Sequence, residues 1–309
     1  MTRTGLRRLA AVPAFIVVFL LALAGVGAFY RPNTDIPAGT SGRQVVVDGV
    51  PLRVVQNGTG RDVLLIHGSP GSVEDWEPVA AALSSSFRVT RFDRPGHGYS
   101  GDDGEYSFEH NAKIALDLIE ALGLARVIVV GHSYGGTTAL AMAVHNPPVV
   151  SAYVVVDSAT YQPGRKPDGA LRLLGWPLIG HGFATVLGPL LSPRRIRQGI
   201  AEQFEGAPPE GFVDLRTRLW STPKVMHAIA LETIGAPAAL NALSPTYGNI
   251  QSPVFVVAEA DSAFRRSTAE RLQRDVRGSS LRLIAGTGHY IQFEKTDDVV
   301  NTVRAAAAR

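Results

Sequence analysis

The chain contains no cysteine among its 309 residues. This absence excludes disulfide bonds, thiolate catalysis and cysteine-based metal sites, and it leaves the redox compartment undetermined. An excess of charge of one sign is also lacking, because 30 basic and 27 acidic residues give a formal net charge of +3. Nucleic-acid binding usually requires a concentrated basic stripe, and we find none. The sequence therefore predicts no nucleic acid, no metal and no cofactor.

A long hydrophobic run is present at the N-terminus. Residues 9–30 carry no charge and would span about 33 Å as a helix, which matches a bilayer core of about 30 Å. Three arginines precede this run and only Arg31 follows closely, so the positive-inside rule places the N-terminus in the cytoplasm. We therefore predict a single-pass transmembrane helix with the rest of the chain outside the cytoplasm. The alternative is a signal segment cut after Ala24 or Ala28, which predicts a secreted protein.

The rest of the chain alternates between strand and helix patterns. Short apolar strands are predicted at residues 44–48, 52–56, 62–66, 87–92, 126–130, 152–156, 254–257 and 281–284. Helices are predicted at residues 72–83, 107–122, 137–144, 268–276 and 296–307. Apolar strands that alternate with helices indicate a mostly parallel sheet covered on both faces. A proline-rich segment at residues 160–250 interrupts this alternation.

The motif Gly131-His132-Ser133-Tyr134-Gly135-Gly136 joins a β-branched strand to a helix. A chain that passes from strand to helix within so few residues needs a strained backbone, and glycines on both sides of Ser133 remove side chains that would collide. The serine hydroxyl is then exposed at the tip of the turn. Amide groups at the start of the helix point to the same place and can stabilise an oxyanion. The motif therefore predicts a nucleophilic serine.

Four segments of the chain together resemble the α/β-hydrolase-fold family, in its lid-bearing esterase and haloperoxidase-like branch. They are residues 67–71 (HGSPG), 93–100 (DRPGHGYS), 131–136 (GHSYGG) and 288–294 (GHYIQFE), and the similarity covers about residues 44–160 and 251–307. The resemblance implies a central, mostly parallel sheet with helices on both faces and a helical lid before the seventh main strand. The implied organisation is an anchor or signal segment (1–30), a linker (31–43), a core in two parts (44–159 and 251–309) and a lid segment (160–250).

The resemblance also implies a catalytic triad in the chain order nucleophile, acid, histidine. Ser133 is then the nucleophile, and His289, in a Gly-Thr-Gly-His loop after the last strand, is the base. Asp261 is the preferred acid, because it follows the strand at residues 253–257 at a spacing from His289 like that of relatives. Asp157, after the preceding strand, and Glu259 are the alternatives.

The oxyanion hole is predicted to consist of two backbone amides. One is that of Tyr134, and the other, by resemblance, is that of Ser69, because Pro70 has no N–H to donate. His67 is expected to brace this loop rather than transfer protons. Asp93 and His97 are expected to brace a turn, because two possible ligands without a third are a poor metal site.

These features predict a carboxylesterase-like serine hydrolase that cleaves an ester of an apolar small or medium substrate through an acyl-enzyme. Carbon–carbon bond hydrolysis, peptide hydrolysis and cofactor-free perhydrolysis remain open, because they can share the triad. A ligand-binding receptor with a retained hydrolase pocket is the alternative from another class. The expected partners are a small ester-like molecule and, through the N-terminal helix, a membrane. Arginines 194, 195 and 197 of the lid segment then face lipid phosphates.

Overall fold

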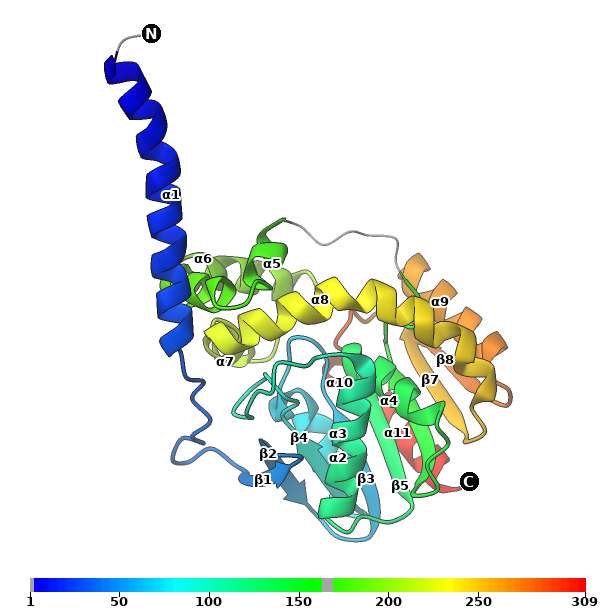
Figure 1. Ribbon diagram of the computed structural model, residues 1–309. Coiled ribbons are helices and arrows are strands. Elements are labelled where there is room, and N and C mark those ends of the chain that lie inside the picture. The colour runs from blue at the N-terminus through cyan, green and yellow to red at the C-terminus, as the bar shows by residue number, and fades with distance from the viewer. Residues whose placement is uncertain (1–2, 163–168) are drawn as a thin grey trace.

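A computed structural model describes residues 3–162 and 169–309, without the side chains of residues 3–12, 14 and 170. Its centre is an eight-stranded sheet in the order β1-β2-β4-β3-β5-β6-β7-β8 (Figure 1). The strands are β1 (Arg43–Val47), β2 (Val50–Asn57), β3 (Arg61–Ile66), β4 (Phe87–Phe92), β5 (Val127–His132), β6 (Val150–Val156), β7 (Val254–Glu259) and β8 (Ser280–Ile284). The hairpin β1–β2 pairs antiparallel with β4, and the strands from β4 to β8 are parallel. The predicted mostly parallel α/β-hydrolase sheet is confirmed.

Helices cover both faces of the sheet, as the alternation of strand and helix patterns in the sequence predicted. One apolar core contains residues of α3 (Phe108–Ala121), α4 (Tyr134–Ala143) and α9 (Ala263–Asp275). The other contains residues of α2 (Glu77–Leu83) and α11 (Thr296–Ala307). Successive side chains of a strand point to opposite faces, and β5 shows this plainly: Val127 and Val129 belong to the first core, and Ile128 and Val130 to the second. This double burial explains why the strands are continuously apolar.

The lid segment separates β6 from β7 and consists of helices. They are α5 (Gly169–Leu174), α6 (Ile179–Ala201), α7 (Phe212–Trp220), α8 (Pro223–Leu243) and the 3-10 helix η2 (Ser244–Asn249). Figure 1 shows α5, α6 and α7 grouped near α1 (Arg3–Phe29), with α8 running from this group toward α9. Residues 163–168 of the predicted lid lie outside the described residues. Two buried ion pairs fasten the lid to the core: Arg216 to Asp75 at 2.6 Å, and Glu232 to Arg94 at 2.5 Å.

The predicted membrane span at the N-terminus is not supported. The residues do form a helix, α1 (Arg3–Phe29), and it extends away from the sheet (Figure 1). Among the described residues, however, no helix is both long enough and apolar enough to cross a bilayer. Helix α1 contains Pro13, and its last turns pack at Leu23 and Gly27 against α6 and against Leu178, the residue before it.

The packing of α1 on α6 depends on close backbone approach. A Cβ atom at Gly182 of α6 would collide with the carbonyl oxygen of Leu23, and one at Gly27 would collide with that of Leu178. Gly199, also in α6, has open space where its Cβ would be. The two glycines of α6 therefore form a matched pair for testing how α1 is held.

We predict that Gly182→Ala weakens the docking of α1 by about 1–3 kcal/mol, because the new methyl group meets backbone that has to move. Gly199→Ala should leave docking unchanged and favour helix α6 itself by about 0.5–1 kcal/mol. Limited proteolysis of the connection at residues 31–42 measures the difference, with faster cutting expected only for Gly182→Ala. Equal cutting of both variants and the unsubstituted chain would show that the close approach contributes no docking energy.

Candidate active site

The carboxyl ends of neighbouring parallel strands bring the predicted functional residues to one edge of the sheet. Ser133 follows β5, Asp157 follows β6 and His67 follows β3, while His289 lies in the loop after β8. Ligand sites of open α/β sheets lie at this edge, because loops that follow adjacent strands converge there.

Ser133 occupies a strained turn between β5 and α4. Its φ of 53° and ψ of −119° are rare for a residue with a side chain. The flanking glycines permit this turn, because a Cβ at Gly131 would collide with backbone of Gly135, and one at Gly135 with backbone of residues 66–67. The side chain of Ser133 makes no capping hydrogen bond to α4, so the helix does not occupy its hydroxyl. The local geometry agrees with that predicted for a nucleophile turn.

His289 is paired with Asp157 and not with Asp261. Its Nδ1 lies 2.6 Å from Oδ2 of Asp157, whose side chain is buried. Asp261 is exposed and accepts a hydrogen bond from the Gly286 amide at 2.8 Å. Glu259 lies 3.5 Å from the guanidinium of Arg265. The preference for Asp261 over Asp157 as the partner of His289 was therefore wrong.

The sheet explains why Asp157 is the partner. Strand β6 is the direct neighbour of β5, and His132 is in register with Val156, the residue before Asp157. Asp157 also has a φ of 43°, which turns the chain sharply at the end of β6. Asp261 comes after the end of β7, one strand further from Ser133, and its carboxylate fixes the neighbouring turn instead.

Three contacts hold the loop that carries His289. The Nε2 of His132 lies 2.9 Å from the carbonyl oxygen of His289, so the residue before the serine is tied to the histidine loop. The backbone N–H of His289 donates to the carbonyl of Gln203 in the lid segment at 2.8 Å. The carboxylate of Glu294 accepts from the Gly288 amide at 2.7 Å. The position of the imidazole is thus fixed by the core and the lid together.

Burial and charge set the protonation of this pair. Burial, followed by the positive charge of Arg265, lowers the pKa of His289 below its ordinary value of 6.5 and outweighs the opposing effect of Asp157. Burial acts in the other direction on Asp157. There the hydrogen bond from His289 and the charges of His289 and Arg265 hold the carboxyl pKa below its ordinary range. At neutral pH the pair is therefore a neutral imidazole beside a carboxylate.

The predicted oxyanion loop lies directly against the serine. A Cβ at Gly68 would be only 3.0 Å from the Cβ of Ser133, so the peptide that carries the Ser69 amide borders the turn. His67 is buried, and its Nε2 accepts from the Arg94 amide at 2.9 Å. Its Nδ1 therefore carries the proton and donates to the Gly68 carbonyl at 2.8 Å. This contact confirms the expectation that His67 braces the loop.

Asp93 also braces the backbone as expected. Its carboxylate accepts from the amides of Val73 at 2.7 Å and Tyr99 at 2.8 Å. His97 instead contacts Glu232 of the lid segment at 3.2 Å, which the sequence did not indicate. Sequence reasoning also missed Arg94, Arg265 and Glu294 as residues that contact the site. Arg94 and Glu294 lie inside the motifs at residues 93–100 and 288–294, and their position there was the signal that could have found them.

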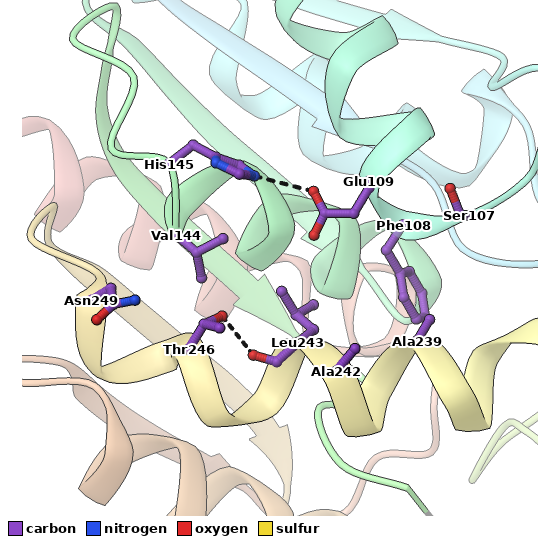
Figure 2. Close-up of a pocket in the computed structure, with 10 residues that line it drawn as sticks. All are labelled: Ser107, Phe108, Glu109, Val144, His145, Ala239, Ala242, Leu243, Thr246 and Asn249. Atoms are coloured by element: carbon purple, nitrogen blue, oxygen red, sulfur yellow. Dashed lines mark hydrogen bonds and ion pairs between the residues drawn. The ribbon is translucent and has the colours of Figure 1, made fainter.

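One well-formed pocket lies elsewhere on the molecule. Its volume is about 340 Å³, and it lies between the start of α3, the end of α4 and the α8–η2 segment (Figure 2). Its lining is largely apolar, with the Glu109–His145 ion pair at 3.2 Å along one side. It includes neither Ser133 nor His289, so it is separate from the candidate active site.

Comparison with known proteins gives the family. A model of the α/β hydrolase family matches residues 63–302. The chain belongs to the α/β hydrolase family. It is similar to a putative esterase/lipase of Haemophilus influenzae, with 22% identity over 78% of this chain and 81% of that protein. It is also similar to esterase Rv0045c of Mycobacterium tuberculosis, with 25% identity over 86% of this chain and 91% of that protein.

The solved structures agree on the fold. The epoxide hydrolase CorEH matches with a TM-score of 0.73 and 20% identity, over 87% of this chain and 98% of that chain. This α/β hydrolase is therefore a hydrolytic enzyme of the family. Because relatives of one fold differ in the reaction they catalyse, the substrate has to be argued from the site.

We predict that the imidazole of His289 titrates below pH 6.5 and that Arg265→Gln moves this pKa upward. Removing the guanidinium removes a positive charge that disfavours the imidazolium, so protonation becomes easier. Histidine NMR titration measures the shift. Arg266→Gln is the matched control, since Arg266 is exposed on the same helix and its loss changes the net charge equally. A similar shift in both variants would mean that overall charge, and not contact with the site, sets the pKa.

Proposed function

We propose that this α/β hydrolase is a serine esterase whose triad is Ser133, His289 and Asp157. The observation that carries the proposal is the 2.6 Å contact between His289 and Asp157 at the edge of the sheet where the strained Ser133 turn lies. Epoxide and haloalkane hydrolysis in this fold use a carboxylate nucleophile. A serine at the turn favours acyl transfer over both.

In the proposed mechanism Asp157 accepts a hydrogen bond from Nδ1–H of His289, which leaves Nε2 unprotonated and free to act as the base. His289 takes the proton of the Ser133 hydroxyl while the serine oxygen attacks the carbonyl carbon of the ester. The amides of Tyr134 and Ser69 donate to the resulting oxyanion. His289 then gives the proton to the departing alkoxide. Water, activated by the same imidazole, releases the acid from the acyl-enzyme.

The surroundings of the histidine loop favour an apolar substrate of small or medium size. Tyr290 stacks on Phe204 of the lid segment with ring centroids 4.8 Å apart, and both belong to an apolar cluster with Phe212 and Trp220. We infer that apolar side chains beside the site contribute by removing apolar substrate surface from water. A series of p-nitrophenyl esters of graded chain length tests this substrate class.

A fluorophosphonate probe tests the nucleophile. We expect covalent labelling of Ser133 in the folded protein and none in Ser133→Ala, which should also lose ester hydrolysis. Absence of labelling in the folded, unsubstituted protein would contradict the proposal and favour the receptor reading.

Replacing each of the two candidate acids in turn tests the triad. We predict that Asp157→Asn lowers kcat by up to about 10⁴-fold, because the amide no longer holds His289 in the reactive tautomer. Asp261→Asn can keep the hydrogen bond from the Gly286 amide through its side-chain oxygen and should lower kcat by no more than about tenfold. Steady-state kinetics on one ester compares them. The reverse order of effects would return the acid to Asp261.

A further inference from the structure

Arg94 is a fully buried arginine that holds the loop of the proposed oxyanion hole. Its Nη2 donates to the Gly68 carbonyl at 2.8 Å, and its Nε donates to the His67 carbonyl at 3.2 Å. Its guanidinium also lies over the ring of Tyr134, 4.6 Å from the ring centre. One side chain therefore contacts the peptide that carries one amide of the proposed hole and the side chain of the residue that carries the other.

The contact with Gly68 acts on a particular peptide group. The carbonyl of Gly68 and the N–H of Ser69 belong to one planar amide, so fixing the oxygen fixes the direction of the N–H. The oxygen receives two donors, Arg94 and Nδ1 of His67. Hydrogen bonds to a carbonyl polarise the amide and make its N–H a stronger donor. Arg94 thus bears directly on the amide that would stabilise the oxyanion.

The opposite charge for Arg94 comes from the lid. Glu232 of α8 is buried and contacts Nη1 of Arg94 at 2.5 Å and His97 at 3.2 Å. Nη1 also donates to the side-chain oxygen of Asn111 in α3 at 3.1 Å. Burial favours the neutral form of Glu232, but the charges of Arg94 and His97 and their hydrogen bonds together outweigh it and lower the carboxyl pKa to about 2. A buried cation without such a partner would be strongly unfavourable.

We propose that Glu232 and Arg94 are positioning residues for the oxyanion hole. The inference rests on the proposed esterase function. Glu232, carried by lid helix α8, holds Arg94 in one orientation, and Arg94 holds the Gly68–Ser69 peptide and the Tyr134 ring. The seated lid is then a structural part of transition-state stabilisation.

The main variant is Arg94→Lys. It keeps the positive charge, but one ammonium group cannot replace the planar guanidinium, which donates hydrogen bonds to four oxygens. We expect kcat to fall by about 10- to 100-fold, less than the roughly 10²–10³-fold cost of deleting an oxyanion donor outright. KM should change by less than about threefold, because the lost interaction operates in the transition state. The inhibition constant of a trifluoromethyl ketone should rise by the same factor by which kcat/KM falls.

Arg216→Lys is the matched control. Arg216 is also a buried arginine between lid and core, paired with Asp75 at 2.6 Å and lying over the ring of Phe212. Its ion pair does not include residues 67–69. The control should lower thermal stability about as much as Arg94→Lys while leaving kcat and the ketone constant within about threefold of the unsubstituted enzyme. Glu232→Gln, which keeps the side-chain shape and removes the charge, is the second test variant should Arg94→Lys not fold.

The outcomes separate the two proposals. Selective loss of kcat and ketone affinity in Arg94→Lys or Glu232→Gln, with normal KM, supports the positioning pair. The same effects in Arg216→Lys, or a change in KM alone, overturn it while the esterase function stands. If the unsubstituted chain neither hydrolyses esters nor binds the ketone, the esterase function fails and the positioning pair fails with it.

Discussion

The hydrogen bond between His289 and Asp157 is the interaction on which the site depends. It joins the loop after the last strand to the end of β6, and it determines which nitrogen of the imidazole carries the proton. Arg265, 2.9 Å from Asp157, keeps the carboxylate charged and disfavours the imidazolium. In the proposed triad the base has to be neutral at working pH, and burial together with this arginine favours that state.

Buried polar contacts, as well as apolar packing, join the lid segment to the core. Arg94, Asp75 and Lys224 each face an oppositely charged or carbonyl partner across the boundary between the two parts. Such contacts are directional. They therefore restrict the position and orientation of the lid segment on the core more than apolar packing alone does. Removing one partner leaves a buried charge unpaired, which makes the seated arrangement strongly preferred over a displaced one.

The sequence was sufficient for the sheet, the helices that cover it and the serine turn. Periodicity predicted β4 and α11 to the residue, and the double burial of the strands explains why their signal was clear. The choice of Asp261 as the partner of His289 failed, because Asp157 and Asp261 both follow apolar strands and their lateral distance from Ser133 depends on strand order. The lack of charge at residues 9–30 also did not reveal that Gly27 packs closely against the backbone of Leu178. Glu232 had no signal, because its partner is 138 residues away in the chain.

Glu294 places a limit on how substrate can enter. Its carboxylate accepts from the amides of Glu205 and Gly206 in the α6–α7 connection, each at 3.0 Å, and also from the Gly288 amide beside His289. Lifting that connection would break the bonds from Glu205 and Gly206 and the bond between the His289 amide and Gln203, and so remove the lid's hold on the histidine loop. In the proposed esterase, substrate that enters without disturbing the base therefore passes another part of the lid segment.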